Sequence, residues 1–292
     1  MRVLLTGGTG FVGQYVSHKL KADGIDLVTL GRSTLNYDSP HIYADLLAPV
    51  DYSKLFRDLN VTHLIHLAWY AEHGKYWSSP LNMDWIKSTA SLVSAFCQHG
   101  GKHITVSGTC AEYDWSHGYC TEEVTPTNPK TIYGISKDAT RRICQNICSD
   151  FDVPIAWGRV FFPYGKGEPK SRLLPSLAEV FQEKKAAFGV NGNCYRDFLH
   201  VSDVASALVA LSTTQASGCI NISSSEAVQI SGVVTIMAKM MAAESGKVLS
   251  LNSLRTGEPT LLVGNNARLR ATGWQQNVKL IDGLKDFYEF KE

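Results

Sequence analysis

The chain of 292 residues has no long apolar run, no excess of charge of one sign and no closely spaced cysteine pair. Its 28 Lys and Arg balance 27 Asp and Glu, so the formal net charge of +1 gives no general attraction to nucleic acid or to an anionic membrane. No apolar stretch is long enough to span a bilayer. The first residues also lack the charged region and apolar core of an export signal. We therefore expect a cytoplasmic protein that binds neither nucleic acid nor a membrane.

The seven cysteines are odd in number, and none belongs to a CxxC pair. Cys144 and Cys148 stand four residues apart in a predicted helix, which leaves metal ligation as one interpretation, but no histidine or second cysteine pair supports it. The favoured interpretation is that the cysteines are small, buried or half-buried thiols in a reducing compartment. We therefore expect no metal site.

The first half of the chain alternates between strand-like and helix-like segments. Apolar runs predict strands at 2–6, 25–30, 62–68, 103–108 and 153–160. Helical patterns fall between them, near 11–23, 51–59, 82–99 and 130–149. Nearly continuous apolar strands separated by helices predict an α/β fold, a doubly wound parallel sheet with helices on both faces.

The pattern changes after Arg159, where a segment rich in Gly, Pro and basic residues indicates a loop. Helices are expected near 173–184, 202–212, 230–243 and 278–290, and a strand at 218–223. We predict two domains with the substrate in the cleft between them. They are a dinucleotide-binding domain of residues 1–160, to which 201–222 return, and a smaller, discontinuous substrate domain of 161–200 and 223–292.

Glycines cluster directly after the first predicted strand, in the segment TGGTGFVG. Gly7, Gly10 and Gly13 separate that strand from a helix that ends near Gly24. Bare backbone allows a tight turn and a close approach, and the helix N-terminus offers N–H groups and partial positive charge to phosphates. The segment therefore predicts a site for a dinucleotide pyrophosphate. A structural turn without a ligand is the alternative.

The TGxxGxxG spacing is accompanied by eight further segments that together resemble one family. They are DL (45–46), HLAW (66–69), SGTCAEY (107–113), TIYGISK (131–137), GRVFFPYG (158–165), RDFLHVSDVASAL (196–208), RTGEP (255–259) and LRATGW (269–274). In this order, and over nearly the whole chain, they resemble the extended short-chain dehydrogenases/reductases, in the branch of nucleotide-sugar epimerases, dehydratases and reductases. The resemblance implies a Rossmann sheet, a nicotinamide dinucleotide cofactor and a nucleoside-diphosphate sugar as substrate for the smaller domain.

The second predicted strand ends without the acid that binds the adenosine ribose in NAD-preferring proteins of this fold. Gly31 stands at that position, and Arg32 follows it. Arg32 can pair with a 2′-phosphate through two donors, and Ser33 and Thr34 add others. We therefore expect NADP(H) to be favoured over NAD(H), with an exposed loop arginine as the alternative. The expected cofactor-binding residues are Gly7, Gly10, Phe11, Val12, Gly13, Arg32, Ser33, Asp45, Leu46, Leu67, Ala68, Trp69, Ser107, Tyr133 and Lys137.

Tyr133 and Lys137 lie one helical turn apart, on one face of a predicted helix. The lysine charge favours the tyrosinate and eases proton exchange with a sugar oxygen. The resemblance implies that Lys137 also holds the nicotinamide ribose, and that Thr109 hydrogen-bonds the reacting oxygen. Ser107 is the competing candidate for that role. Thr109, Tyr133 and Lys137 are thus the expected catalytic residues.

Departures from the family pattern separate the reaction types. In the 4,6-dehydratases an Asp and a Glu follow the Ser/Thr, whereas here Cys110 and Ala111 follow Thr109, and Glu112 is one place out of register. Dehydration is therefore disfavoured. Epimerases keep their cofactor through the cycle and usually keep the acid that Gly31 replaces, while a cofactor exchanged in each turnover suits reduction. We expect NADPH to reduce a nucleoside-diphosphate 4-keto-6-deoxyhexose at C4 in deoxysugar biosynthesis, with a nucleotide-sugar 4-epimerase as the alternative.

Basic and aromatic residues are the expected substrate contacts. Arg196 and Arg255 match family arginines that meet the diphosphate, and Arg172 lies in the loop that usually covers the nucleotide. Phe162 replaces the family asparagine, which points to a different sugar or orientation. In the segment WYAEHGKYW (69–77), Trp69, His73 and Tyr76 are expected to shape the sugar pocket, although a packed surface loop is the alternative. The expected substrate-binding residues are His73, Tyr76, Thr109, Arg172, Arg196 and Arg255.

Two other function classes fit parts of the sequence. An idle dinucleotide-binding redox sensor would not need all of Thr109, Tyr133 and Lys137. A reductase of small aldehydes or phenolic ketones would not need Arg196 and Arg255, because its substrates carry no diphosphate. By resemblance the family usually forms dimers, so we expect a homodimer in which the segments 82–99 and 130–149 make the contact.

Overall fold

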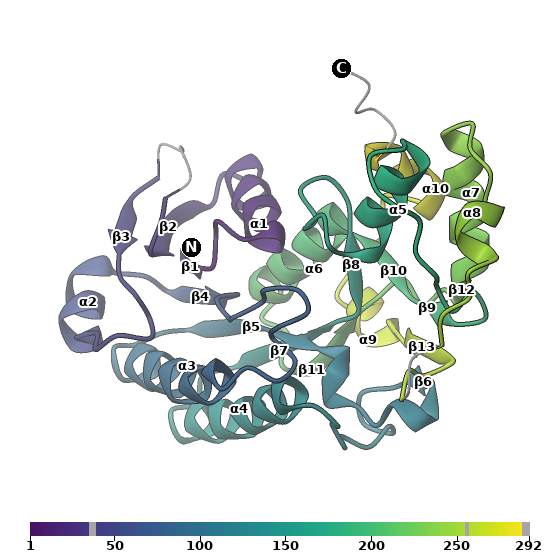
Figure 1. Ribbon diagram of the computed structural model, residues 1–292. Helices are drawn as coiled ribbons and strands as arrows, with labels where there is room; N and C mark the ends of the chain where they lie inside the picture. Colours follow the sequence, from purple (N-terminus) through teal and green to yellow (C-terminus); the bar gives the residue numbers. More distant parts are fainter. Residues whose placement is uncertain (35–38, 255–256, 288–292) are drawn as a thin grey trace.

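The centre of the molecule is a seven-stranded sheet in which every neighbouring pair of strands is parallel. A computed structural model describes residues 1–34, 39–254 and 257–287. The strand order is β3-β2-β1-β4-β5-β7-β11 (Figure 1), which confirms the predicted doubly wound fold. The strands are β1 (Arg2–Thr6), β2 (Asp26–Gly31), β3 (His41–Tyr43), β4 (His63–His66), β5 (His103–Thr109), β7 (Ile155–Val160) and β11 (Gly218–Ile222).

Helices cover both faces of this sheet (Figure 1). On one face α1 (Phe11–Ala22) packs against α6 (Val201–Thr213). On the other face α3 (Leu81–Gln98) packs against α4 (Ile132–Asp150), with α2 (Tyr52–Leu59) beside α3. None of the described helices has both the length and the apolar composition needed to cross a membrane.

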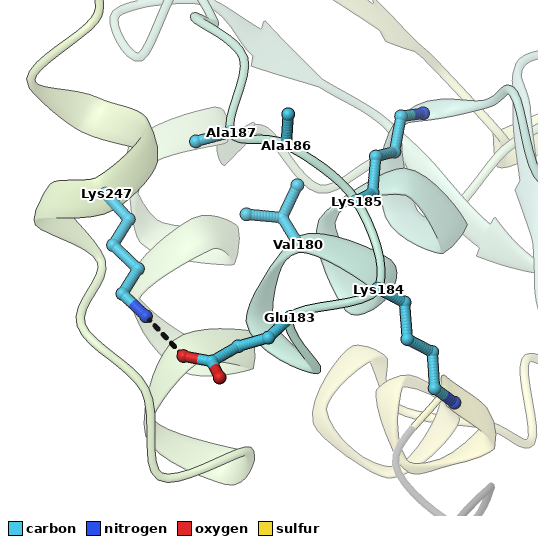
Figure 2. A pocket seen from close by; sticks show the side chains of 7 residues that line it. All are labelled: Val180, Glu183, Lys184, Lys185, Ala186, Ala187 and Lys247. Atoms are coloured by element: carbon cyan, nitrogen blue, oxygen red, sulfur yellow. Dashed lines mark hydrogen bonds and ion pairs between the residues drawn. The ribbon is translucent and has the colours of Figure 1, made fainter.

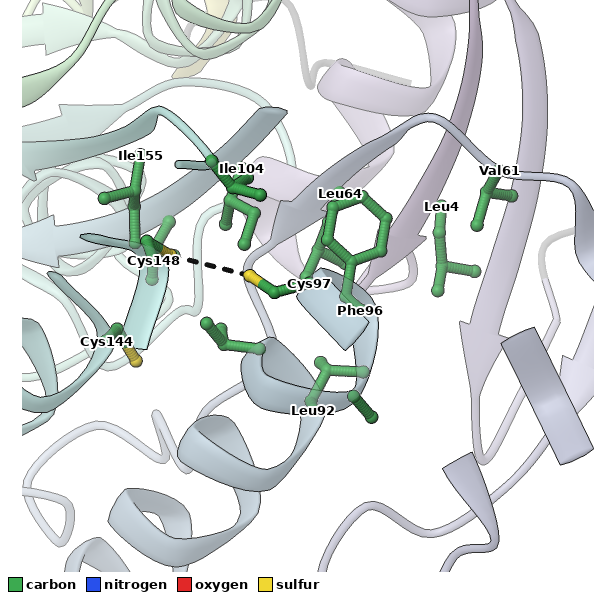
Figure 3. Packing of buried hydrophobic residues seen from close by; sticks show 14 of the residues in the cluster. Leu4, Val61, Leu64, Leu92, Phe96, Cys97, Ile104, Cys144, Cys148 and Ile155 are labelled. Atoms are coloured by element: carbon green, nitrogen blue, oxygen red, sulfur yellow. Dashed lines mark hydrogen bonds between the residues drawn. The ribbon is translucent and has the colours of Figure 1, made fainter. Parts of the chain in front are cut away.

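The two faces carry separate cores because side chains alternate along a strand. In β1, Val3 and Leu5 join the core shared with α1 and α6, while Leu4 joins the core under α3 and α4. Three cysteines belong to that second core (Figure 3), where the Sγ atoms of Cys97 and Cys148 lie 3.9 Å apart. The third is Cys144.

The remaining elements form a smaller lobe at the edge of the sheet where β7 and β11 lie (Figure 1). Its core joins α5 to α7 and contains Leu174, Leu177, Val233 and Met237. The larger elements are α5 (Leu173–Phe181), α7 (Ile230–Met240), β8 (Phe162–Tyr164), β10 (Phe198–His200) and β13 (Leu261–Gly264). The shorter ones are β6 (Tyr119–Cys120), β9 (Tyr195–Arg196), β12 (Val228–Gln229), α8 (Gly246–Leu249), α9 (Ala267–Ala271) and α10 (Leu280–Gly283).

The helix expected near 278–290 begins at Leu280, and its predicted end lies outside the described residues. Only α10 and a following 3₁₀ turn, Leu284–Phe287, are present up to the last described residue. Gly283 packs so closely on the Tyr164 hydroxyl that a side chain there would collide with it. The division into two domains stays a prediction. α6 and β11 lie with the large sheet, but Leu269 and Trp274 also pack into the core shared with α1 and α6.

Candidate active site

The glycine loop between β1 and α1 has the geometry of a phosphate cradle. Gly7 has a positive φ of 72°, and a Cβ there would lie 2.7 Å from the backbone nitrogen of Ala68. A side chain at Gly13 would collide with the carbonyl oxygen of Gly7. Gly10 caps α1 without any side-chain hydrogen bond, and the first turn of the helix holds no acidic residue. The helix N-terminus is therefore presented bare, as an anion requires.

The residues expected to hold the adenosine end lie next to this loop. The Ser33 hydroxyl donates to Thr9 Oγ1 at 3.3 Å. Arg32 follows the end of β2 with its side chain 77% exposed, and its Nη1 lies 4.0 Å from Asp45 Oδ2. Gly31 has no atom closer than 4.0 Å to the position of a Cβ. The end of β2 therefore carries an exposed guanidinium, and the Asp45 carboxylate lies near it.

The segment after β4 forms the next part of the expected cofactor site. The backbone N–H of Ala68 donates to Thr6 Oγ1 at 3.3 Å, which ties the segment to the end of β1. The indole N–H of Trp69 donates to Asn82 Oδ1 at 2.8 Å, and its ring stacks on Trp85 with centroids 5.9 Å apart. Leu67 precedes these residues and packs against the core under α1, while the buried Leu46 packs against the other core.

Lys137 lies on α4 with its amine buried at the end of β5. Its Nζ donates to the carbonyl oxygen of Ser107 at 2.9 Å and lies 3.9 Å above the Trp69 ring. Burial lowers the pKa of Lys137 to about 7, and the nearby Glu112 opposes that shift. The amine is therefore poised to lose its proton near neutral pH, unlike an ordinary lysine.

Tyr133 lies one turn earlier on the same helix, in an aromatic enclosure. Its ring meets those of Tyr76 and Trp77 edge-on, at centroid distances of 4.8 and 5.7 Å. Its backbone N–H donates to the carbonyl oxygen of Trp77 at 3.2 Å. Burial raises the pKa of Tyr133, the neighbouring Tyr76 adds to the rise, and a hydrogen bond with Thr109 opposes it. Thr109, Tyr133 and Lys137 thus gather at one point between β5 and α4.

Thr109 is fixed by the fully buried carboxylate of Glu112. The Thr109 backbone N–H donates to Glu112 Oε1 at 2.8 Å, and Thr109 Oγ1 accepts from the backbone N–H of Ala111 at 3.2 Å. Glu112 also accepts from Trp157 Nε1 and Arg159 Nε, each at 2.8 Å. This carboxylate is fully engaged inside the protein and does not face a substrate.

The segment after Trp69 brings one of its predicted pocket residues to Tyr133 and leaves another on the surface. Tyr76 packs on Tyr133 as described, and burial raises the pKa of Tyr76. His73 is exposed in the turn that precedes it. Trp77 and Trp115, which the sequence did not single out, extend the aromatic wall with ring centroids 6.2 Å apart.

Arg172 approaches the same wall from the loop that follows β8. Its positive charge lowers the pKa of Tyr76 against the effect of burial, and its Nε lies 2.9 Å from Glu168 Oε1. The loop is held at both sides. The Tyr15 hydroxyl of α1 donates to the Lys166 carbonyl oxygen at 2.9 Å, and the Lys166 N–H donates to Asp286 at 2.9 Å.

Arg196 is already engaged with protein groups. Its Nη1 donates to the carbonyl oxygens of Tyr195 and Pro259 at 2.8 Å, and its Nη2 donates to Glu258 at 3.0 Å. Phe162, the off-pattern residue, lies under the guanidinium at 5.8 Å. The second expected arginine, Arg255, lies outside the described residues, so its role stays a prediction.

Two surface hollows are lined by none of Thr109, Tyr133 and Lys137. One, of about 410 Å³, is on the smaller lobe (Figure 2) and is lined by Val180, Glu183, Lys184, Lys185, Ala186, Ala187 and Lys247. The other, of about 380 Å³, lies beside β11 and contains Arg141, Arg159 and Arg268. These arginines are paired with Asp138, Glu112 and Glu123. Over the described ranges, no group of three or more His, Cys, Asp or Glu could hold a metal ion.

Comparison with known proteins shows similarity to enzymes that act on nucleotide sugars. A model described as the NAD dependent epimerase/dehydratase family matches residues 3–223. The chain is 27% identical to the GDP-6-deoxy-D-mannose reductase of Pseudomonas aeruginosa, over 97% of this chain and 95% of that protein. It is 24% identical to the dTDP-6-deoxy-L-talose 4-dehydrogenase (NAD(+)) of Aggregatibacter actinomycetemcomitans, over 76% and 83%. The UDP-glucose 4-epimerase structure of Thermus thermophilus, in complex with NAD, superposes with a TM-score of 0.85 at 22% identity, over 99% and 100%.

Proposed function

This chain belongs to the NAD dependent epimerase/dehydratase family, and from that premise we propose that it reduces a nucleoside-diphosphate 4-keto-6-deoxyhexose at C4 with NADPH. Tyr133 is the proton donor of this reaction, and Thr109 hydrogen-bonds the reacting oxygen. The relatives named as a reductase and as a 4-dehydrogenase of 6-deoxyhexose nucleotides support the substrate class.

One observation carries the proposal. Thr109, Tyr133 and Lys137 meet at the end of β5, and no free carboxylate accompanies them from the 110–112 segment. Cys110 and Ala111 hold the positions after Thr109, and Glu112 is fully buried against Arg159 at 2.8 Å. A site with a proton donor but without a second acid–base pair suits carbonyl reduction better than elimination of water.

The glycine loop fits a dinucleotide, because side chains at Gly7 and Gly13 would collide with the backbone of Ala68 and of Gly7 and prevent the tight turn that a pyrophosphate needs. When bound, the nicotinamide supplies the hydride. Lys137 then holds the ribose, and the positive charge of its buried amine favours the tyrosinate form of Tyr133. Tyr76 and Trp77 pack edge-on against the Tyr133 ring and restrict its movement.

The preference for NADPH is supported by the residues at the end of β2. Gly31 removes the acid that would repel a 2′-phosphate, and Arg32 and Ser33 stand beside the glycine loop. The Asp45 carboxylate, 4.0 Å from Arg32, works in the opposite direction. We propose that the phosphate displaces this weak, exposed contact, since a phosphate is the better partner for a guanidinium.

A nucleotide-sugar 4-epimerase that recycles a bound cofactor is the second candidate. The feature in its favour is that Thr109, Tyr133 and Lys137 would serve equally when a retained nicotinamide takes a hydride from C4 and returns it, since both steps need the same proton transfer at the C4 oxygen. The similarity to the Thermus thermophilus epimerase shows the fold and does not choose between the reactions.

The deciding experiment presents the purified protein with NADPH and a 4-keto-6-deoxyhexose in its UDP, dTDP, GDP and CDP forms, each made in situ by a dehydratase. Loss of the reduced-nicotinamide absorbance in step with substrate, absent in Tyr133→Phe, is the expected result. No loss with any of the four nucleotides, together with a tightly held cofactor that copurifies, would reject reduction in favour of epimerisation.

We also propose a homodimer formed through α3 and α4. The two helices pack side by side, and apolar side chains stay exposed on them, namely Met83, Ile135 and Ile143. Light scattering should give twice the chain mass for the wild type and the chain mass for the double variant Ile135→Glu/Ile143→Glu. A monomeric wild type would reject this contact.

A further inference from the structure

Glu168 is a buried acid in the loop beside the proposed active site, and the roles assigned above leave it without a function. Its side chain is only 3% exposed. One oxygen, Oε1, pairs with Arg172 Nε at 2.9 Å. The other oxygen, Oε2, is buried and has no hydrogen-bond partner among the residues that the structure describes. An orphaned carboxylate oxygen is costly in a folded protein, so its retention needs a reason.

The neighbours of Glu168 connect it to the proposed active site. Arg172, its ion-pair partner, is close enough to Tyr76 to lower the pKa of that tyrosine, and Tyr76 packs on Tyr133 at 4.8 Å. Gly167, the residue before it, faces Phe11 at the start of α1, since a Cβ there would lie 3.9 Å from Phe11 Cδ2. Glu168 therefore belongs to a loop between the glycine-loop helix and the aromatic wall.

We propose that Glu168 is a specificity-determining residue, whose Oε2 accepts a hydrogen bond from a hydroxyl group of the bound sugar while Oε1 holds Arg172 beside Tyr76. This assignment rests on the proposed function, because it names the part of a nucleotide sugar that the site recognises. The favoured ligand is a hexose that keeps a hydroxyl toward this loop.

Charge and burial support this role. Burial raises the pKa of Glu168 to about 7, and both the charge of Arg172 and a hydrogen bond with the Gly165 backbone oppose the rise. A hydroxyl donor on Oε2 stabilises the ionised form and compensates for the lost solvation. A hydrogen bond to a charged group of this kind corresponds to about a 10- to 100-fold change in binding.

The test compares Glu168→Ala and Glu168→Gln with the wild type. Calorimetry measures the dissociation constants of each nucleoside diphosphate and of the matching diphosphohexose, with UDP and UDP-glucose, dTDP and dTDP-glucose, GDP and GDP-mannose, and CDP and CDP-glucose as the probes. For each nucleotide we divide the dissociation constant of the diphosphate by that of the diphosphohexose. This ratio measures the contribution of the sugar to binding, because any effect on the diphosphate through Arg172 cancels. Glu183→Gln, an exposed acid paired with Lys247, is the matched control.

We expect Glu168→Ala to reduce this ratio at least about 10-fold and to raise KM for the keto sugar more than it lowers kcat. Glu168→Gln keeps an acceptor oxygen and should lose less, and Glu183→Gln should change neither quantity. If Glu168 only holds the loop, its loss would lower the melting temperature. It would also weaken binding of the diphosphate and of the diphosphohexose by the same factor, so the ratio would not change.

The outcomes separate the two claims. If the wild type turns over the keto sugar and the ratio is unchanged in Glu168→Ala, the assignment of Glu168 is wrong and the proposed function stands. If the wild type neither binds nor converts a sugar of any of the four nucleotides, the proposed function is wrong and the assignment falls with it.

Discussion

Replacing Glu112 by Gln should cost the protein a large share of its stability. The carboxylate is fully buried and accepts hydrogen bonds from Thr109 N, Trp157 Nε1 and Arg159 Nε, each at 2.8 Å. An amide has one acceptor oxygen, so its NH₂ group must face one of these donors. The exchange also leaves the Arg159 charge without its partner at 1% exposure. Breaking a buried pair costs about 3–5 kcal/mol, against a typical total of about 5–15 kcal/mol.

Urea unfolding followed by tryptophan fluorescence measures this change directly. A loss of this size shifts the midpoint by about 1 M or more. Glu123→Gln is the control, because Glu123 pairs with Arg268 at the surface and its loss should change the free energy of unfolding by less than about 1 kcal/mol. Turnover of Glu112→Gln should fall as well, since the lost bond positions Thr109. A loss below about 1 kcal/mol in Glu112→Gln would refute the argument that this pair holds the end of β5.

Three further expectations follow from the geometry. Gly13→Ala should abolish cofactor binding in a fluorescence titration, because the methyl group would collide with the Gly7 carbonyl oxygen; unchanged affinity would reject the cradle. Arg32→Ala should lower the NADPH-to-NADH ratio of kcat/KM at least about 10-fold, and an unchanged ratio would place the 2′-phosphate elsewhere. Between about pH 7 and 10.5 the unfolded chain keeps a proton on Lys137 that the folded chain has lost, so that residue makes the free energy of unfolding rise with pH. Lys137→Met should remove this rise in urea titrations at about pH 6 and 9, whereas equal slopes would contradict the lowered pKa.

The large sheet could be predicted because its strands are long apolar runs separated by helical patterns. β3 was missed, since three residues are too few to show a period. The strands of the smaller lobe that have two residues were missed for the same reason. The last predicted helix changes from α10 to a 3₁₀ turn at Leu284, a change that no local pattern reports.

The proximity of Thr109, Tyr133 and Lys137 could be predicted because their spacing is local, whereas their catalytic role stays a prediction. Tyr133 and Lys137 share a helix face, and Thr109 ends the strand beside that helix. The buried role of Glu112 and the orphaned oxygen of Glu168 could not be predicted. Each is an ordinary acid in the sequence, and only tertiary packing decides that it is buried. Trp77 belongs to the aromatic segment 69–77, but its contact with Tyr133 could not be predicted, because it depends on how that segment turns.

The two anchors of the Glu168 loop have a consequence for the order in which the protein is made. Tyr15, on the first helix, and Asp286, near the last described residue, hold Lys166 from opposite ends of the chain. A chain emerging from the ribosome can pair all seven strands once residue 222 is available, because domains begin to fold from their N-terminal side during synthesis. The loop gains its second anchor only after residue 286 has been made. The site that the loop borders is therefore completed late in synthesis, after the sheet that supports it.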